Sequence, residues 1–526
     1  MKRLAILIAL GAILAVPFAL RPAKRSTAAA QDTVVIVTPH NEAIRHEYEL
    51  GFQAWYLART GRTVAVDWRV LGGTSEIARH LNGAYAGSFQ NLWTNSLGRP
   101  WSQTVQEAFQ NGHLAADAAP EAREARRAFL ASSASSGIDV YFGGDGPDME
   151  DHADAGHLWD SGLLRRRPEW FTDQVIPQHW GGELFWRADG FWFGSVVSSY
   201  GILYNRDELS RLGLPEPKQW DDLADARYAG TLALCDPTKS GSMATAFENM
   251  LQQKMQARAG GLPEAMAVRA GWNDGLRLIQ RLGANARYFT DTSQKPPIDV
   301  ADGNCAAGVC IDFYGNQQIE AVLRRGDARR LGFESPAGGT AYSIDPIALL
   351  RGAPHREAGS LFIEYALSLD GQKLWDFRPG TPGGPQEFAL RRAPIRRDFY
   401  ARADWKAYRS DPDFTPYGPG DRLIYRAERT GPVFRELAFV VRVMCLDTHA
   451  ELAEAWRAIQ AAPADRRAAA LAKLQDVSFV SYDAARGPIA AALDSADRVA
   501  EVRLAKDLAD RFRANYRAAI SCSRGR

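Results

Sequence analysis

The sequence lacks most of the patterns that mark metalloproteins, nucleic-acid-binding proteins and hydrolases. Its 526 residues include only five cysteines, with no CxxC pair and no Cys/His spacing typical of zinc. Its 63 basic and 62 acidic residues leave a formal net charge of +1, which gives no bulk attraction to nucleic acid or to an anionic membrane. The GxSxG and HExxH motifs and a recognisable pair of catalytic carboxylates are absent. We therefore expect no nucleic-acid partner, no metal and no cofactor, and we expect the protein not to be an enzyme.

The sequence has one long apolar run, and it lies at the amino terminus. A basic start at residues 1–3 precedes the apolar residues 4–20, and small residues follow up to Ala30. This layout predicts a secretory signal over residues 1–30 that is cleaved after Ala30. Arg21 interrupts the pattern before the small residues, so an uncleaved membrane anchor is the alternative. Either reading predicts a periplasmic or extracytoplasmic protein that touches a membrane only through this segment.

Export would expose the five cysteines to an oxidising compartment, where they can pair. Cys305 and Cys310 are close in sequence and form one candidate pair. Cys445 and Cys522 form the other, which leaves Cys235 single. The spacing leaves the connectivity open.

From residue 33 onward, short apolar runs alternate with amphipathic helical patterns. Residues 34–37 read as a buried strand, and apolar residues then recur at helical spacing from about Asn41 to Ala58. Residues 63–70 alternate as a second strand before another helix begins at Ile77. The strand-to-loop pattern returns at residues 137–146, 195–205, 230–242 and 306–316. This order predicts an α/β fold with parallel sheets that are covered by helices.

Polar residues follow several of these predicted strands. Ligands bind at the carboxyl ends of strands in open parallel sheets, because loops and helix starts converge there. The residues at such ends are His40, Gly73, Thr74, Ser75, Gly144, Asp145, Thr238, Ser240, Gly241 and Tyr314. Two helix starts rich in hydroxyl groups, at 72–76 and 238–242, offer free backbone N–H groups to an anion. Both could equally be simple helix caps, with Thr74 or Ser75 as the capping residue of the first.

Three further patterns have both a plain and a functional reading. The acid-rich segment 145–157 reads as a solvated helix face, with only Asp145 as a candidate for ligand contact. A predicted strand ending at Tyr314 places Cys310, Asp312 and Tyr314 on one face. Cys235 could be a nucleophile at a strand end, although a buried and inert cysteine is far commoner.

Two regions lie outside the α/β pattern. Residues 87–135 are polar and rich in Ala and Ser, which predicts a helical insertion with loose linkers. From about residue 404, Ala, Arg, Glu and Leu recur in helical runs, which predicts several helices packed on the body.

Six motifs together are similar to those of one family. They are VVIVTPHNEAI, IDVYFGG, SSYGILYNRDEL, WDDLADARYAGTLALCDPTKSG, AAGVCIDFYGN and FIEYALSLDGQKLW, spread over about residues 33–400. The chain resembles the periplasmic solute-binding proteins of ABC importers, type 2 class, in the branch with ferric-ion-, thiamine- and phosphosugar-binding members. The resemblance implies two α/β lobes joined by hinge-crossing strands, with the ligand closed between them. It implies lobe one over 31–195 and 330–403, lobe two over 196–329, and a helical C-terminal extension over 404–526.

The resemblance also bears on the ligand. In ferric-binding members an iron-ligating histidine occupies the position of His40, and Tyr314 matches the second of two adjacent iron-binding tyrosines. Phe313 stands where the first tyrosine would be, and Gly144 where an acidic ligand would be. Ferric iron prefers hard anionic oxygen donors, and two of the four ligands are missing. The resemblance therefore implies a small organic solute rather than iron.

These patterns combine into one expected site and one expected function. The predicted ligand-binding residues are His40, Asn41, Gly73, Thr74, Ser75, Gly144, Asp145, Ser198, Thr238, Ser240, Gly241, Tyr314 and Asp345. The two helix starts suit an anionic end of the ligand, and the two aspartates suit hydroxyl or amino groups, as in a sugar phosphate. We expect a monomeric receptor that delivers this solute to an ABC permease. The alternatives are a ferric-iron receptor, an enzyme with Cys235 as nucleophile, and an anchored sensor whose tail recruits a partner.

Overall fold

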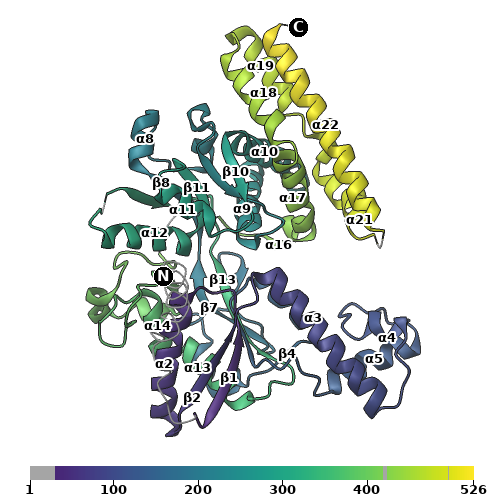
Figure 1. Ribbon diagram of the computed structural model, residues 1–526, viewed down its shortest axis with the longest axis vertical. Helices are drawn as coiled ribbons and strands as arrows, with labels where there is room; N and C mark the ends of the chain where they lie inside the picture. Colours follow the sequence, from purple (N-terminus) through teal and green to yellow (C-terminus); the bar gives the residue numbers. More distant parts are fainter. Residues whose placement is uncertain (1–29, 328, 419–422, 496, 526) are drawn as a thin grey trace, which may run out of the picture.

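The structure is a computed structural model that describes residues 30–327, 329–418, 423–495 and 497–525. The predicted signal or anchor lies outside the described residues except for residue 30. Two sheets form the body, with an arm of helices on one side and a group of helices at the far end (Figure 1). Within the described ranges, no helix combines the length and the apolar character needed to cross a bilayer.

The first sheet forms the core of the first lobe. Its strands run in the order β14-β7-β13-β3-β1-β2, and β4 pairs with β13 at one end. They are β1 (Asp32–Val37), β2 (Val64–Arg69), β3 (Val140–Phe142), β4 (Leu158–Trp159), β7 (Trp192–Ser198), β13 (Ser343–Leu350) and β14 (Ala393–Pro394). β1 is parallel to β2 and β3, whereas β13 is antiparallel to both β3 and β7.

The second sheet forms the core of the second lobe. Its order is β10-β9-β11-β8-β12. The strands are β8 (Tyr200–Asn205), β9 (Leu232–Cys235), β10 (Ala286–Thr290), β11 (Ala307–Ile311) and β12 (Leu331–Glu334). β9 is parallel to β10 and β11, and β8 is antiparallel to β11 and β12. Both sheets are therefore mixed: the parallel pairing expected from the sequence holds for β1–β3 and for β9–β11, and the strands that cross between the lobes are antiparallel to their neighbours.

Two connections cross from one sheet to the other, which confirms the expected two-lobed fold. β7 lies in the first sheet and β8 in the second, with Ser199 alone between them. The predicted continuous strand over residues 195–205 is thus two strands. Asp312 holds the break, because its Oδ2 accepts hydrogen bonds from the Ser199 backbone N–H at 2.7 Å and from the Ser199 hydroxyl at 3.1 Å. The return crossing runs from the end of β12 to the start of β13.

Helix α2 (Glu42–Thr60) shows how local sequence sets an element. Asn41 caps it by accepting a hydrogen bond from the Ile44 N–H at 3.2 Å. Its buried residues, Ile44, Glu47, Tyr48, Phe52 and Tyr56, recur at helical spacing and face the first sheet. Gly61 ends the helix with a φ of 72°, a conformation that glycine adopts at low cost.

The predicted helical insertion is present as an arm on the first lobe. Helix α3 (Thr74–Asn91) leads outward from the body, and α4 (Gln103–Ala108) and α5 (Pro120–Ala131) lie at its far end (Figure 1). Aromatic side chains hold the arm together, since the Phe109 ring stacks on Phe89 at 5.0 Å and meets Phe129 edge-on at 5.2 Å.

The C-terminal helices pack on the second lobe, at the end of the molecule away from the first sheet (Figure 1). The longest are α17 (Phe434–Val441), α18 (His449–Ala461), α19 (Ala464–Leu474) and α22 (Arg498–Arg524). Of these, α17 and α18 contact α10 (Glu264–Asn285), whereas α19 and α22 pack mainly on each other and on α18. Beyond α19, Val480 O accepts from the Trp272 indole of α10 at 2.9 Å. The tail predicted from about residue 404 is not helical throughout. Residues 409–418 and 423–426 form neither helix nor strand. The residue limits predicted for the lobes and the tail stay predictions.

The cysteine pairs expected from export are wrong in this structure. The free cysteines are Cys235, Cys305, Cys310, Cys445 and Cys522. Cys305 and Cys310 are five residues apart along an extended segment, about 16 Å, whereas a disulfide needs Cα atoms within about 7 Å. Tyr516 of α22 reaches the Cys445 segment by donating to Met444 O. Cys522 lies six residues further along that helix, about 9 Å away.

Candidate functional site

The seam between β1 and α2 holds His40 in place. The Thr38 hydroxyl donates to Phe142 O at 2.6 Å and accepts from the His40 N–H at 3.0 Å. Asn41 then begins α2 as its cap. The histidine ring lies edge-on to Phe142, with ring centres 4.6 Å apart, so it is packed inside the first lobe. The local sequence therefore fixes His40 at a strand end, as predicted, but buries it.

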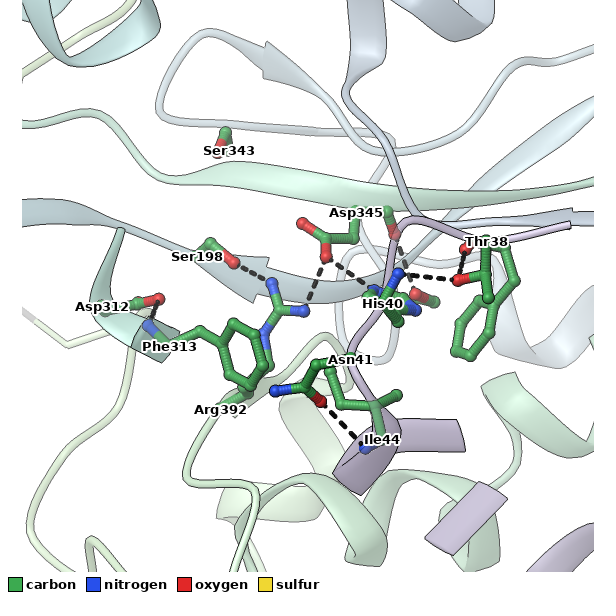
Figure 2. A network of polar contacts seen from close by, with 12 residues as sticks. Thr38, His40, Asn41, Ile44, Ser198, Asp312, Phe313, Ser343, Asp345 and Arg392 are labelled. Atoms are coloured by element: carbon green, nitrogen blue, oxygen red, sulfur yellow. Dashed lines mark hydrogen bonds and ion pairs between the residues drawn. The ribbon is translucent and has the colours of Figure 1, made fainter. Parts of the chain in front are cut away.

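His40 belongs to a buried ionic network that sequence reasoning found only in part (Figure 2). Its Nε2 lies 3.0 Å from Oδ2 of Asp345 on β13. Arg392 donates from Nη1 to the same carboxylate oxygen at 2.6 Å, and from Nη2 to the hydroxyl of Ser198 on β7. The Arg392 guanidinium also lies 5.0 Å from the ring centre of Phe313 in the second lobe. The network thus connects the two crossing strands and contacts the other lobe.

The charges in this network are set by burial and pairing. Burial opposes ionisation of Asp345, but the charge of Arg392 and the hydrogen bonds from His40 and Arg392 hold its pKa well below the usual range. Burial lowers the pKa of His40 in spite of its Asp345 partner. A neutral His40 donates from Nε2 to Asp345, so its buried Nδ1 is left as an acceptor with no partner among the described residues.

Tyr314 does not lie on a strand, and that prediction was wrong. β11 ends at Ile311 and helix α12 (Asp312–Arg324) begins at once. Asp312 starts the helix by accepting from the Phe313 N–H at 2.6 Å while it also binds Ser199. Cys310 and Tyr314 therefore do not share the face of one strand. The Tyr314 hydroxyl accepts from Gln294 at 3.5 Å, and burial raises its pKa.

The two lobes meet where the hydroxyl-rich helix starts were predicted. Ser240 caps α9 (Gly241–Ala259) by accepting from the Met243 N–H at 3.2 Å. A Cβ on Gly241 would lie 3.1 Å from Oδ2 of Asp145 and 3.9 Å from Oγ1 of Thr74, both in the first lobe. The starts of α3 and α9 therefore face each other across the junction, and Asp145 stands between them.

The remaining predicted residues have local structural roles. Gly73, not Thr74 or Ser75, is the capping residue of α3, and the Glu76 carboxylate accepts from its N–H at 3.1 Å. This corrects the predicted cap, because neither hydroxyl forms the capping bond. Ser75 is exposed, and the exposed Thr238 donates to Asp236 at 2.7 Å. Gly144 has a φ of 106° beside Tyr141. Whether these positions, or any of the predicted set, contact a ligand stays a prediction.

The acid-rich segment 145–157 is not a plain solvated face. It forms helix α6 (Gly146–Ala155), which Asp145 caps by accepting from the Asp148 N–H at 2.9 Å. His152 and His157 are buried, with 2% and 0% of their surface exposed. The correction has a physical cause, since each ring finds a polar partner inside the lobe: the two Nδ1 atoms lie 2.9 Å apart.

Three acidic side chains, Asp145, Glu183 and Glu248, lie close enough for their charges to act on one another. Glu248 accepts from Tyr425 at 3.0 Å and from Thr430 at 2.5 Å. Burial raises the pKa of Glu183 to about 8 and that of Glu248 to about 7, and also raises that of Asp145.

These raised pKa values predict that the protein loses stability as the pH rises from about 5 to 8. A glutamate in the unfolded chain titrates near 4.3, so in this range the folded state binds more protons and unfolding becomes easier as they leave. Glu183→Gln removes one such proton and should flatten the pH dependence of the unfolding free energy, which urea titrations at pH 5 and pH 8 measure. The exposed Glu428→Gln is the control. Equal slopes for wild type and Glu183→Gln would refute the burial argument.

Sequence reasoning missed Arg392. It comes just before β14, in the segment RRAPIRR, where four arginines occur within seven residues. No local sequence feature distinguishes Arg392, which is 3% exposed, from the neighbouring arginines. The charge of Asp345, which was predicted to lie in the site, gave the one available signal, because a buried carboxylate requires a cation or several donors.

Residues 183–400 match the sequence profile of a family described as bacterial extracellular solute-binding protein. That stretch spans both lobes, because it includes the whole second sheet together with β7, β13 and β14 of the first. The match covers less than half of the chain, and over these residues the protein is similar to the bacterial extracellular solute-binding proteins. Proteins of this family act in transport.

Comparisons with individual proteins are more distant. The chain is 28% identical to an uncharacterised protein of Haemophilus influenzae over 242 residues, which are 45% of this chain and 60% of that protein. It is 27% identical to the phosphoglycerate transport regulatory protein PgtC of Salmonella typhimurium over 34% of this chain and 39% of that protein. It thus spans less than two thirds of the length of either relative.

Solved structures align over more of the chain than these relatives do, but with low structural-similarity scores. The periplasmic binding protein AfuA from Actinobacillus pleuropneumoniae aligns over 81% of this chain and 98% of its own, at 16% identity and a TM-score of 0.47. The apo ferric ion-binding protein A of Pasteurella haemolytica aligns over 78% and 96%, at 14% identity and a TM-score of 0.46. With scores below 0.5, neither likeness bears on the ligand of this protein.

Proposed function

We propose that the protein is an extracytoplasmic receptor that closes two lobes over one small solute and presents it to an ABC permease. The observation that carries the proposal is the meeting of Asp145 and Thr74 with Gly241 at facing helix starts. Asp145 and Thr74 belong to the first lobe and Gly241 to the second. Two short connections, one of them a single residue, join the lobes at the hinge. The similarity of residues 183–400 to a family of solute-binding proteins supports the same function.

The ligand that suits this junction best is a small hydroxylated molecule with an anionic end. The first turns of α3 and α9 have backbone N–H groups that favour an oxyanion. Asp145 accepts hydrogen bonds from hydroxyl groups, and its raised pKa makes a protonated, donating form accessible. Arg392 is already neutralised by Asp345, so it supports the site rather than binding the anion directly. A sugar phosphate is the ligand class to test first, and the name of the relative PgtC points the same way.

Two other functions fit the geometry less well. A ferric site needs a tyrosinate, but burial raises the pKa of Tyr314, and His40 is engaged by Asp345. A nucleophilic Cys235 needs a thiolate, but this cysteine is fully buried and burial raises its pKa to about 11. We therefore propose a receptor that is not an enzyme, with a signal or anchor at residues 1–30 and the lobe limits given above. We also propose that it works as a monomer.

A thermal-shift screen of the purified protein tests the proposed ligand class. Sugar phosphates, phosphonates, thiamine compounds, polyols and ferric salts are the probes, and an anionic, hydroxylated compound should raise the melting temperature most. Ser240→Ala should weaken the binding of that compound about tenfold. The variant loses the capping hydrogen bond that fixes the direction of the first α9 N–H groups. The exposed Ser495→Ala, far along the tail, is the matched control. Stabilisation by uncharged compounds or metals alone, or equal affinity in Ser240→Ala, would refute the proposed ligand class.

A further inference from the structure

A cavity lies away from the junction of the lobes, where the arm joins the first lobe. Its volume is about 460 Å³, and it lies between α3, the end of α4 and α6. The polar groups that line it are mostly acceptors of hydrogen bonds. They include Glu107, Gln110, Asp148, Asp151 and His152. No lysine or arginine is among the residues that line it.

A chain of hydrogen bonds fixes the protonation of the histidine at this cavity. The Gln110 amide donates from Nε2 to Asn82 O at 3.3 Å, so its Oε1 is the atom that faces His157 Nε2 at 2.6 Å. His157 therefore carries its proton on Nε2 and accepts at Nδ1. His152 must then donate from its own Nδ1, 2.9 Å away. Burial lowers the pKa of His152 to about 4 and lowers that of His157 well below its usual range, so both rings are neutral at pH 7.

The result is a fixed lone pair on His152 Nε2. This atom lies on the side of the ring opposite His157, 3.9 Å from Oδ1 of Asp148, and it has no hydrogen-bond partner among the described residues. The His152 side chain is only 3% exposed, so solvent does not readily satisfy the atom. An acceptor without a donor beside a cavity lined by carboxylates points to a missing donor. Asp148 already accepts from Tyr141 at 2.8 Å and leaves its other oxygen toward His152.

We propose that this cavity binds a small organic cation whose ammonium group donates to His152 Nε2 and to the carboxylates of Asp148 and Asp151. An ammonium supplies three donors and one positive charge, which matches the His152 acceptor and two carboxyl groups. Burial raises the pKa of Asp148 to about 7 and also raises that of Asp151, so a bound cation would favour their ionised forms. A bare metal ion fits less well. The described residues contain no group of three His, Cys, Asp or Glu side chains arranged to hold one, and the cavity is far larger than an ion. This site is independent of the proposed transport ligand.

Isothermal titration of the full chain with 1,4-diaminobutane tests the site, with 1,4-butanediol as an uncharged molecule of the same shape. We expect the diamine to bind at least tenfold more tightly than the diol. Asp151→Asn changes an exposed residue and should weaken diamine binding about tenfold, the effect of losing one charge-assisted contact. His152→Asn keeps a donor toward His157 but removes the Nε2 acceptor. This variant should weaken diamine binding at least as much as Asp151→Asn does. Asp117→Asn, an exposed acid elsewhere on the arm, is the control.

The location is tested by hydrogen exchange, which should slow in residues 103–110 and 146–157 when the diamine binds. Diamine binding should also persist in Gly241→Phe, a variant expected to disturb only the junction of the lobes, so failure here is distinguishable from failure of the proposed receptor function. The proposal is overturned if the diol binds as tightly as the diamine, or if calcium or magnesium binds and the diamine does not. It is also overturned if the site variants weaken diamine binding no more than Asp117→Asn does. Slower hydrogen exchange confined to other segments would overturn it as well.

Discussion

Replacing Arg392 by methionine should lower the free energy of unfolding by about 3–5 kcal/mol, the cost of removing one partner from a buried ion pair. Arg392 is 3% exposed and donates to Asp345 at 2.6 Å. Without it, the Asp345 carboxylate keeps only His40, which is neutral and offers a single donor. The carboxylate must then be ionised without a cation or become protonated, and either is costly inside the lobe. Urea titration at pH 7, followed by circular dichroism, measures the change.

A double variant separates the ion pair from simple loss of packing. Arg392→Met with Asp345→Asn removes both charges, so it should be more stable than the sum of the two single variants predicts. The exposed Arg79→Met should change stability by no more than about 0.5 kcal/mol. A loss below 1 kcal/mol in Arg392→Met, or additive effects in the double variant, would show that the network does not hold the hinge strands together.

Replacing Gly241 by phenylalanine should weaken the binding of the transported solute about tenfold to a hundredfold. A Cβ at this position already lies 3.1 Å from Asp145 Oδ2, closer than most real contacts, and a ring has no room unless the lobes separate. Gly241 is the first residue of α9 and needs no left-handed backbone, so the helix itself tolerates a side chain. Titration of the best ligand from the thermal-shift screen measures the loss.

The matched control is Gly87→Phe, because Gly87 lies in helix α3 and a Cβ there meets nothing within 4 Å. It should bind the ligand as the wild type does. Urea titration of both variants checks that they remain folded. Full affinity in Gly241→Phe would contradict a ligand site that requires Asp145 and Gly241 to approach each other.

The parts of the fold that depend on neighbouring residues could be predicted from the sequence. The cap at Asn41, the apolar stripe of α2 and the cap at Ser240 each follow from residues within one or two turns. The crossing strands could be expected only from the family resemblance, because an apolar run over residues 195–205 does not show that the chain changes sheets at Ser199.

The failures concern contacts between residues distant in sequence. Tyr314 was placed on a strand because the apolar pattern continues past Ile311, whereas the helix starts where Asp312 binds Ser199, 113 residues away. Arg392 could not be assigned because its partner lies on β13. The burial of His152 depends on its bond to His157, whose second nitrogen finds Gln110 on the arm.

The most direct test of the central claim is disulfide trapping of the variant Thr74→Cys/Gly241→Cys. A Cβ at Gly241 lies 3.9 Å from Thr74 Oγ1, so side chains at these two positions lie within reach of each other across the junction. Oxidation with the ligand present should form the bond faster than without it, and the locked protein should keep its ligand until a reductant opens it. A bond that forms at the same rate with and without ligand, or a locked protein that still exchanges ligand freely, would contradict a solute held between two closing lobes.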